Sequence, residues 1–128
     1  MNSKDRILLV EDEEQHAELF FEALEDMEVE PDMYWVTNSS LALEAIVELF
    51  HDLAIIDITL NESELDGLAL TREIKKRSPR TRICVFSISD SETDKQAAKA
   101  AGADIFLTKP LSYYKIFPKM EEMFSLIK

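Results

Sequence analysis

Residues 53–61 read LAIIDITLN, and this stretch indicates the fold. Four apolar residues precede Asp57 without a polar interruption. An unbroken apolar run of this length is typical of a strand that a parallel sheet buries on both faces. A carboxylate at the end of such a strand is costly unless a cation compensates its charge. Asp57 is therefore the first candidate for a functional residue.

Comparable apolar runs recur along the chain and alternate with longer segments of helical periodicity. These runs are Ile7–Val10, Met33–Val36, Ile83–Phe86 and Ile105–Leu107. Five successive strand–helix units predict an α/β fold. The chain has only two glycines, which argues against a Gly-rich dinucleotide loop and against a P-loop. We therefore expect a flavodoxin-like (βα)5 three-layer sandwich, with a five-stranded parallel sheet in the order 2-1-3-4-5.

Local signals predict where the helices begin and end. Ser39 or Ser40 is placed to cap the second helix, and the sequence SETD at residues 91–94 is typical of a capping box before the fourth. The last helix is predicted from about Tyr113 to Ile127. Because proline lacks an amide donor, Pro118 predicts a kink there or a poorly ordered first turn.

Composition narrows the classes of function. The chain has 128 residues, 46% of them hydrophobic, and a net charge of -12. This length fits a single domain over residues 1–128. The negative charge disfavours nucleic acid and anionic membranes, and it suits metal cations or basic partners unless it serves only solubility. No run of residues predicts a signal peptide or a membrane span, so we expect a cytoplasmic protein.

Polar side chains follow four of the predicted strands. Glu11 and Asp12 come after the first, Asp57 after the third, Ser87 after the fourth and Lys109 close behind the fifth. The carboxyl ends of parallel strands share one edge of a sheet, so we expect these groups to converge. Three clustered carboxylates repel one another, and a hard divalent ion such as Mg²⁺ would relieve the repulsion.

The same groups suit phosphoryl transfer. An ionised carboxylate such as Asp57 can act as a nucleophile and form an acyl phosphate. Mg²⁺ and Lys109 would neutralise the transferred oxygens, and the Ser87 hydroxyl would donate a hydrogen bond to one of them. Taken singly, each group also has a structural explanation: a helix start, a turn hydroxyl or a surface lysine. His16 and His51 are placed on helical segments away from this edge, as solvated or structural residues.

Several stretches resemble the receiver domain of two-component response regulators. The matching stretches are ILLVEDE, DLAIID, LDGLAL, ICVFSIS and AGADIFLTKPL. The resemblance implies that Asp57 is the phosphoacceptor. It also implies Mg²⁺ ligands from Glu11, Asp12 and Asp57 and from the backbone carbonyl of Thr59. No other cofactor is implied.

The resemblance further implies a signalling switch. A histidine kinase or histidine phosphotransfer protein would donate the phosphoryl group, with Lys109 and Ser87 assisting. Ser87 and Phe106 would then move, and a changed surface would bind a downstream target protein. Such a domain is not an enzyme beyond slow autodephosphorylation. We expect a monomer or weak dimer without an output domain, and a cis bond between Lys109 and Pro110.

Departures from the family pattern leave two alternatives open. The loop after Asp57 is long and carries Glu62 and Glu64, Ile88 stands where a small residue is usual, and Pro118 interrupts the last helix. The first alternative is a pseudo-receiver, an interaction module that is not phosphorylated. The second is a Mg²⁺-dependent phosphatase, which would need a second acid where Thr59 stands. Thr59 and Ser89 lie where the family tunes dephosphorylation, and because neither is an acid or an amide, we expect a long-lived phosphoryl group.

Overall fold

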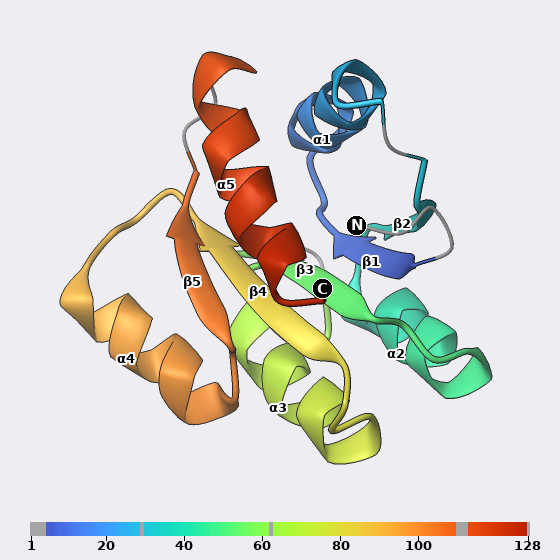
Figure 1. Ribbon diagram of the computed structural model, residues 1–128. Coiled ribbons are helices and arrows are strands. Elements are labelled where there is room, and N and C mark those ends of the chain that lie inside the picture. Colours follow the sequence, from blue (N-terminus) through green and yellow to red (C-terminus); the bar gives the residue numbers. More distant parts are fainter. Residues whose placement is uncertain (1–4, 29, 62, 110–112, 128) are drawn as a thin grey trace.

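The computed structural model describes residues 5–28, 30–61, 63–109 and 113–127 (Figure 1). Strands and helices alternate along the chain. They are β1 (Arg6–Val10), α1 (Glu14–Asp26), β2 (Asp32–Val36), α2 (Ser39–Glu48), β3 (Leu53–Asp57), α3 (Gly67–Arg77), β4 (Arg82–Ser87), α4 (Glu92–Ala101), β5 (Ile105–Thr108) and α5 (Tyr113–Ser125). The five strands form one parallel sheet in the order β2-β1-β3-β4-β5, which confirms the predicted fold.

Helices cover both faces of the sheet, with α1 and α5 on one side and α2, α3 and α4 on the other (Figure 1). Successive residues of each strand point to opposite faces. In β1, Ile7 and Leu9 belong to the core under α1 and α5, whereas Leu8 and Val10 belong to the core over α2, α3 and α4. This double burial explains why the central strands β1, β3 and β4 read as unbroken apolar runs.

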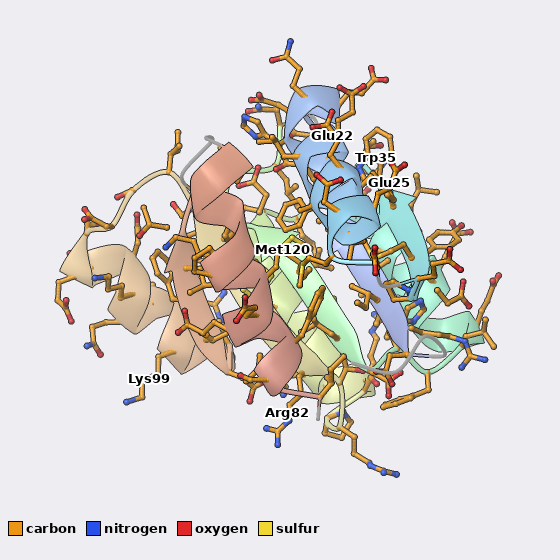
Figure 2. All side chains as sticks on the ribbon, turned by 45° about the horizontal axis from the view of Figure 1, so that its top comes forward. Glu22, Glu25, Trp35, Arg82, Lys99 and Met120 are labelled. Carbon is orange, nitrogen blue, oxygen red and sulfur yellow. The ribbon has the colours of Figure 1, made fainter. Side chains whose placement is uncertain are left out.

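Side-chain positions agree with these layers (Figure 2). Met120 lies between α5 and the sheet and is 1% exposed, whereas Lys99 and Arg82 extend away from the body. Within the described residues, no helix is both long enough and apolar enough to cross a membrane.

The helix starts differ from prediction in one place. The side chain of Asn38 caps α2 by accepting the Leu41 amide at 3.0 Å, so the expectation of a Ser39 or Ser40 cap was wrong. Asn38 takes this position because α2 already begins at Ser39. The capping sequence at residues 91–94 is confirmed, since the Ser91 hydroxyl accepts the Asp94 amide.

The last helix begins at Tyr113, as predicted, and ends two residues early, at Ser125. Pro118 lies inside it. The expected cis bond between Lys109 and Pro110 lies outside the described residues, and so does Glu62 of the long loop.

Helix α3 starts in close contact with the end of β3. The Gly67 amide donates to the Ile58 carbonyl at 3.1 Å. A side-chain carbon built on Gly67 would lie 2.2 Å from the Asp57 carbonyl oxygen. Only glycine fits at this contact, which fixes the backbone that carries Asp57.

Candidate metal centre at the carboxyl edge of the sheet

The structure brings four of the predicted side chains into one buried cluster. Lys109 Nζ lies 2.6 Å from Glu11 Oε1 and 3.2 Å from Asp57 Oδ2. One carboxylate oxygen from each of Glu11, Asp12 and Asp57 lies within 4.8 Å of the other two. Glu11 and Asp12 follow β1, Asp57 ends β3 and Lys109 follows β5, so the shared edge of a parallel sheet positions the cluster.

Strand alternation explains which side of the sheet the cluster occupies. Leu9, Ile55 and Leu107 pack toward α1 and α5. Glu11, Asp57 and Lys109 each lie two positions after one of these residues, so by strand alternation their side chains lie on the same side of the sheet. The Ser87 side chain belongs to the other series, with Ile83 and Val85, and its hydroxyl accepts the Ser89 amide at 3.0 Å. Its backbone carbonyl accepts the Lys109 amide, which joins the ends of β4 and β5.

The acidic cluster fits a hard divalent cation. Asp12 Oδ1 is buried and, among the described residues, has no hydrogen-bond partner. Asp12 Oδ2 accepts the amide of Asn61, from the long loop, at 2.8 Å. Three carboxylates without a nearby thiolate suit Mg²⁺ rather than a softer metal. A cation bound here would satisfy the Asp12 oxygen and reduce the repulsion among the carboxylates.

The site is under electrostatic strain when no cation is bound. Burial raises the pKa of the Glu11 carboxyl to about 8, and the neighbouring Asp57 carboxylate adds to the rise, although Lys109 opposes it. Burial disfavours the charged form, and a second carboxylate does the same. A proton and a divalent cation therefore compete for this pocket.

Both oxygens of Asp57 are held in place. The Thr59 amide donates to Oδ1 at 3.1 Å, and Lys109 lies 3.2 Å from Oδ2. The Thr59 carbonyl stays a predicted metal ligand. This arrangement fixes the orientation of the Asp57 carboxylate at the rim of the sheet, which a nucleophile would need.

His16 lies at this site, which contradicts the expectation that it is remote. Its Nδ1 atom is 3.1 Å from Lys109 Nζ and 3.3 Å from Glu11 Oε1. The expectation failed because α1 begins at Glu14, directly beside the carboxyl edge. The alternation that places Glu11 on the α1 side of the sheet was the signal that could have found it.

The second histidine is structural, as expected, but it lies in the loop after α2 rather than on a helix. His51 is buried, and its Nδ1 is 2.9 Å from the Leu49 carbonyl. Its own carbonyl accepts the Thr81 hydroxyl. Burial lowers the pKa of His51, which favours the neutral imidazole.

The long loop after Asp57 is hydrogen-bonded to the start of α2 and to Asp12. The Ser63 hydroxyl donates to the Ser39 hydroxyl at 2.9 Å, and the Leu65 amide donates to the same oxygen at 3.1 Å. The Asn61 amide bonds Asp12. Glu64 is exposed. The described part of this loop is therefore anchored at both ends.

Two further residues singled out from the sequence lie directly after β4 and within β5. Ile88 is 70% exposed, so its side chain faces solvent. Phe106 is half-buried and packs against the core that contains Ile83 and Val85. Its role as a switch stays a prediction.

Sequence reasoning missed Trp35. Its indole N–H donates to the Glu11 carbonyl at 2.8 Å, and its ring meets Phe21 edge-on with centroids 6.4 Å apart. The Trp35 side chain thereby helps to fix the backbone at Glu11. An aromatic residue with a polar atom on the strand next to β1 was the available signal.

Comparison with known proteins identifies the family to which the chain is similar. The sequence model of the response regulator receiver domain matches residues 7–121. The transcriptional regulatory protein YkoG of Bacillus subtilis is 30% identical over 120 residues, which cover 91% of this chain and 50% of that protein. The chain spans half or less of the length of the first curated relatives it matches.

Solved structures show the same similarity. The receiver domain of NtrX from Brucella abortus has a TM-score of 0.74 and 31% identity, covering 93% of this chain and 98% of that one. The phosphorylated cyanobacterial phytochrome response regulator RcpA has a TM-score of 0.84 at 22% identity, covering 97% of this chain and 94% of that one. The second likeness concerns the fold alone.

Proposed function

This chain belongs to the response regulator receiver domain family, and from that premise we propose that Asp57 accepts a phosphoryl group in the presence of Mg²⁺. The donor is a histidine kinase or a histidine phosphotransfer protein. The acceptor reaction switches a surface that binds a downstream target protein. The protein is not an enzyme beyond slow autodephosphorylation, and it acts as a monomer or weak dimer.

One observation carries the proposal: a single buried ammonium group contacts both Glu11 and Asp57, beside an Asp12 oxygen that lacks a partner among the described residues. Acidic residues on a surface do not need a buried ammonium group beside them. A pocket that binds both a cation and an added negative group needs one to balance the charge.

The chemistry is a displacement at phosphorus. One Asp57 carboxylate oxygen forms a bond to the phosphorus atom, the bond from phosphorus to the donor imidazole breaks, and the imidazole nitrogen keeps the electron pair. Lys109 is in place to meet the incoming oxygens, since its ammonium already contacts Asp57. Mg²⁺ bound by Glu11, Asp12, Asp57 and the Thr59 carbonyl would supply further positive charge.

The switch would use residues behind the acceptor. Ser87 ends β4, next to β3, and a rotation of its hydroxyl away from the Ser89 amide would let it donate to the new phosphoryl group. Phe106 pairs with Val85 in the adjacent strand, so a shift of β4 reaches it directly. A small change in local charge would thereby bias two arrangements of one surface.

The test is incubation with acetyl phosphate and Mg²⁺, followed by intact mass measurement. We expect the wild-type chain to gain one phosphoryl group, and the Asp57→Asn variant and an EDTA-treated sample to gain none. Purified phosphohistidine donor should give the same result more rapidly. If a folded wild-type protein gains no mass with either donor, the pseudo-receiver alternative is correct instead. Turnover of phosphate monoesters would support the phosphatase alternative.

A further inference from the structure

The Lys109 ammonium has a complete set of acceptors in the described structure. Its three N–H groups have three neighbours: Glu11 Oε1 at 2.6 Å, His16 Nδ1 at 3.1 Å and Asp57 Oδ2 at 3.2 Å. The Lys109 side chain is only 3% exposed, so water contributes little to its solvation. Each proton of the ammonium therefore has a defined direction.

The contact with Lys109 gives His16 the role of an acceptor. An ammonium group only donates hydrogen bonds, so in this contact Nδ1 accepts through its lone pair, and the same atom lies 3.3 Å from Glu11 Oε1. The other ring nitrogen, Nε2, lies 3.3 Å from Glu13 Oε2. An N–H at Nε2 donating to this carboxylate would fix the tautomer from the far side of the ring.

We propose that His16 is a positioning residue for Lys109, acting as a hydrogen-bond acceptor at Nδ1 that leaves one ammonium proton directed at Asp57. This inference rests on the proposed phosphoryl transfer and assigns a further residue to it. Glu11 and His16 hold two of the three protons, and the third points toward Oδ2 of Asp57, the proposed acceptor.

The charge of the pocket explains why a neutral acceptor is suitable here. Glu11, Asp12 and Asp57 already place three carboxylates within one small volume. A fourth carboxylate at position 16 would increase their repulsion and would also compete with Asp57 for Lys109. An apolar residue would leave one buried N–H of the ammonium without an acceptor, and Lys109 would turn toward the carboxylates alone.

The test compares two substitutions at position 16. His16→Leu removes the acceptor, and His16→Asn restores one, because the Asn side-chain oxygen can take the place of Nδ1. With acetyl phosphate and Mg²⁺, we expect His16→Leu to slow phosphorylation of Asp57 roughly ten- to a hundredfold, because a small misplacement of a positioned group can cost about a hundredfold in rate. His16→Asn should recover most of this loss. Gln15→Leu, which places the same side chain at an exposed position of α1, should match the wild type.

A spectroscopic measurement tests the contact without any phosphorylation. Nitrogen NMR of the metal-free wild type should show His16 with an unprotonated Nδ1 and a protonated Nε2. A proton on Nδ1 would overturn the inference, as would an undiminished rate for His16→Leu, or equal rates for the Leu and Asn variants. A wild type that shows the expected tautomer but gains no phosphoryl group would refute the proposed function and leave the contact itself established.

Discussion

The raised pKa of Glu11 predicts an unusual pH dependence of stability. In the metal-free folded protein this carboxyl titrates at about 8, against an ordinary value of 4.5. At neutral pH the unfolded chain has lost the proton, whereas the folded chain keeps most of it. Unfolding therefore releases a proton, and the free energy of unfolding must fall as pH rises toward 8.

The magnitude follows from the size of the pH window. The slope is at most ~1.4 kcal/mol per pH unit for one proton, so a rise from about pH 6.5 to about pH 8 should cost roughly 1–2 kcal/mol. For a chain of 128 residues, this corresponds to a fall in melting temperature of about 4–8 °C. Below about pH 6.5, the lowered pKa of His51 acts in the opposite direction, since the unfolded chain then binds the extra proton.

The assay is urea unfolding in EDTA at a series of pH values, repeated with saturating Mg²⁺. Because the cation displaces the Glu11 proton, Mg²⁺ should bind more tightly as pH rises, and the downward slope should flatten. The Glu11→Gln variant should lose the slope in EDTA. The Asp57→Asn variant should reduce it, because a neighbouring negative charge is removed. A stability in EDTA that is constant or increasing from pH 6.5 to 8 would refute this reasoning.

Three further predictions concern how the fold supports the site. Gly67→Ala should destabilise the protein by about 1–3 kcal/mol in urea unfolding, because the added carbon meets the Asp57 backbone at 2.2 Å; a variant at least as stable as wild type would contradict this placement. Ser39→Ala should cost about 1–2 kcal/mol and should make residues 61–65 more sensitive to limited proteolysis, because two hydrogen bonds to the loop are lost. Asp104 accepts bonds from Lys75, Arg82 and the Ile83 amide, and its hydrogen bonds hold its pKa below 3.8 although burial opposes them. The stability it contributes should therefore be present above about pH 4 and lost as pH falls through the lowered pKa, so the Asp104→Asn variant should show a weaker acid dependence in thermal melts.

The central strands β1, β3 and β4 were predictable because they are buried on both faces, whereas the edge strand β2 is largely exposed. In the central strands the apolar run and the strand nearly coincide, and the observed ends differ from the predicted ones by a single residue at most. The clustering of the polar residues that follow these strands was also predictable, because parallel strands bring their carboxyl ends to one edge of the sheet. The proximity of Glu11, Asp57 and Lys109 needed no other information.

The remaining contacts depend on how distant segments meet. Asn38, Ser39 and Ser40 can all cap a helix, and only the start of α2 decides among them. The Ser39 hydroxyl meets Ser63, 24 residues away, and no local pattern predicts this pair. His16 was missed because its helix was located by periodicity, which does not state where the first turn lies relative to the sheet edge.

The hydrogen bond from Trp35 to the Glu11 carbonyl has a practical consequence. The chain contains a single tryptophan, and that residue contacts the backbone of a carboxylate in the cluster. The protein thus carries an intrinsic fluorophore that is hydrogen-bonded to the backbone of the acidic cluster. Emission from one indole can report the arrival of an ion or a phosphoryl group in stopped-flow mixing, without a dye and without altering the polypeptide.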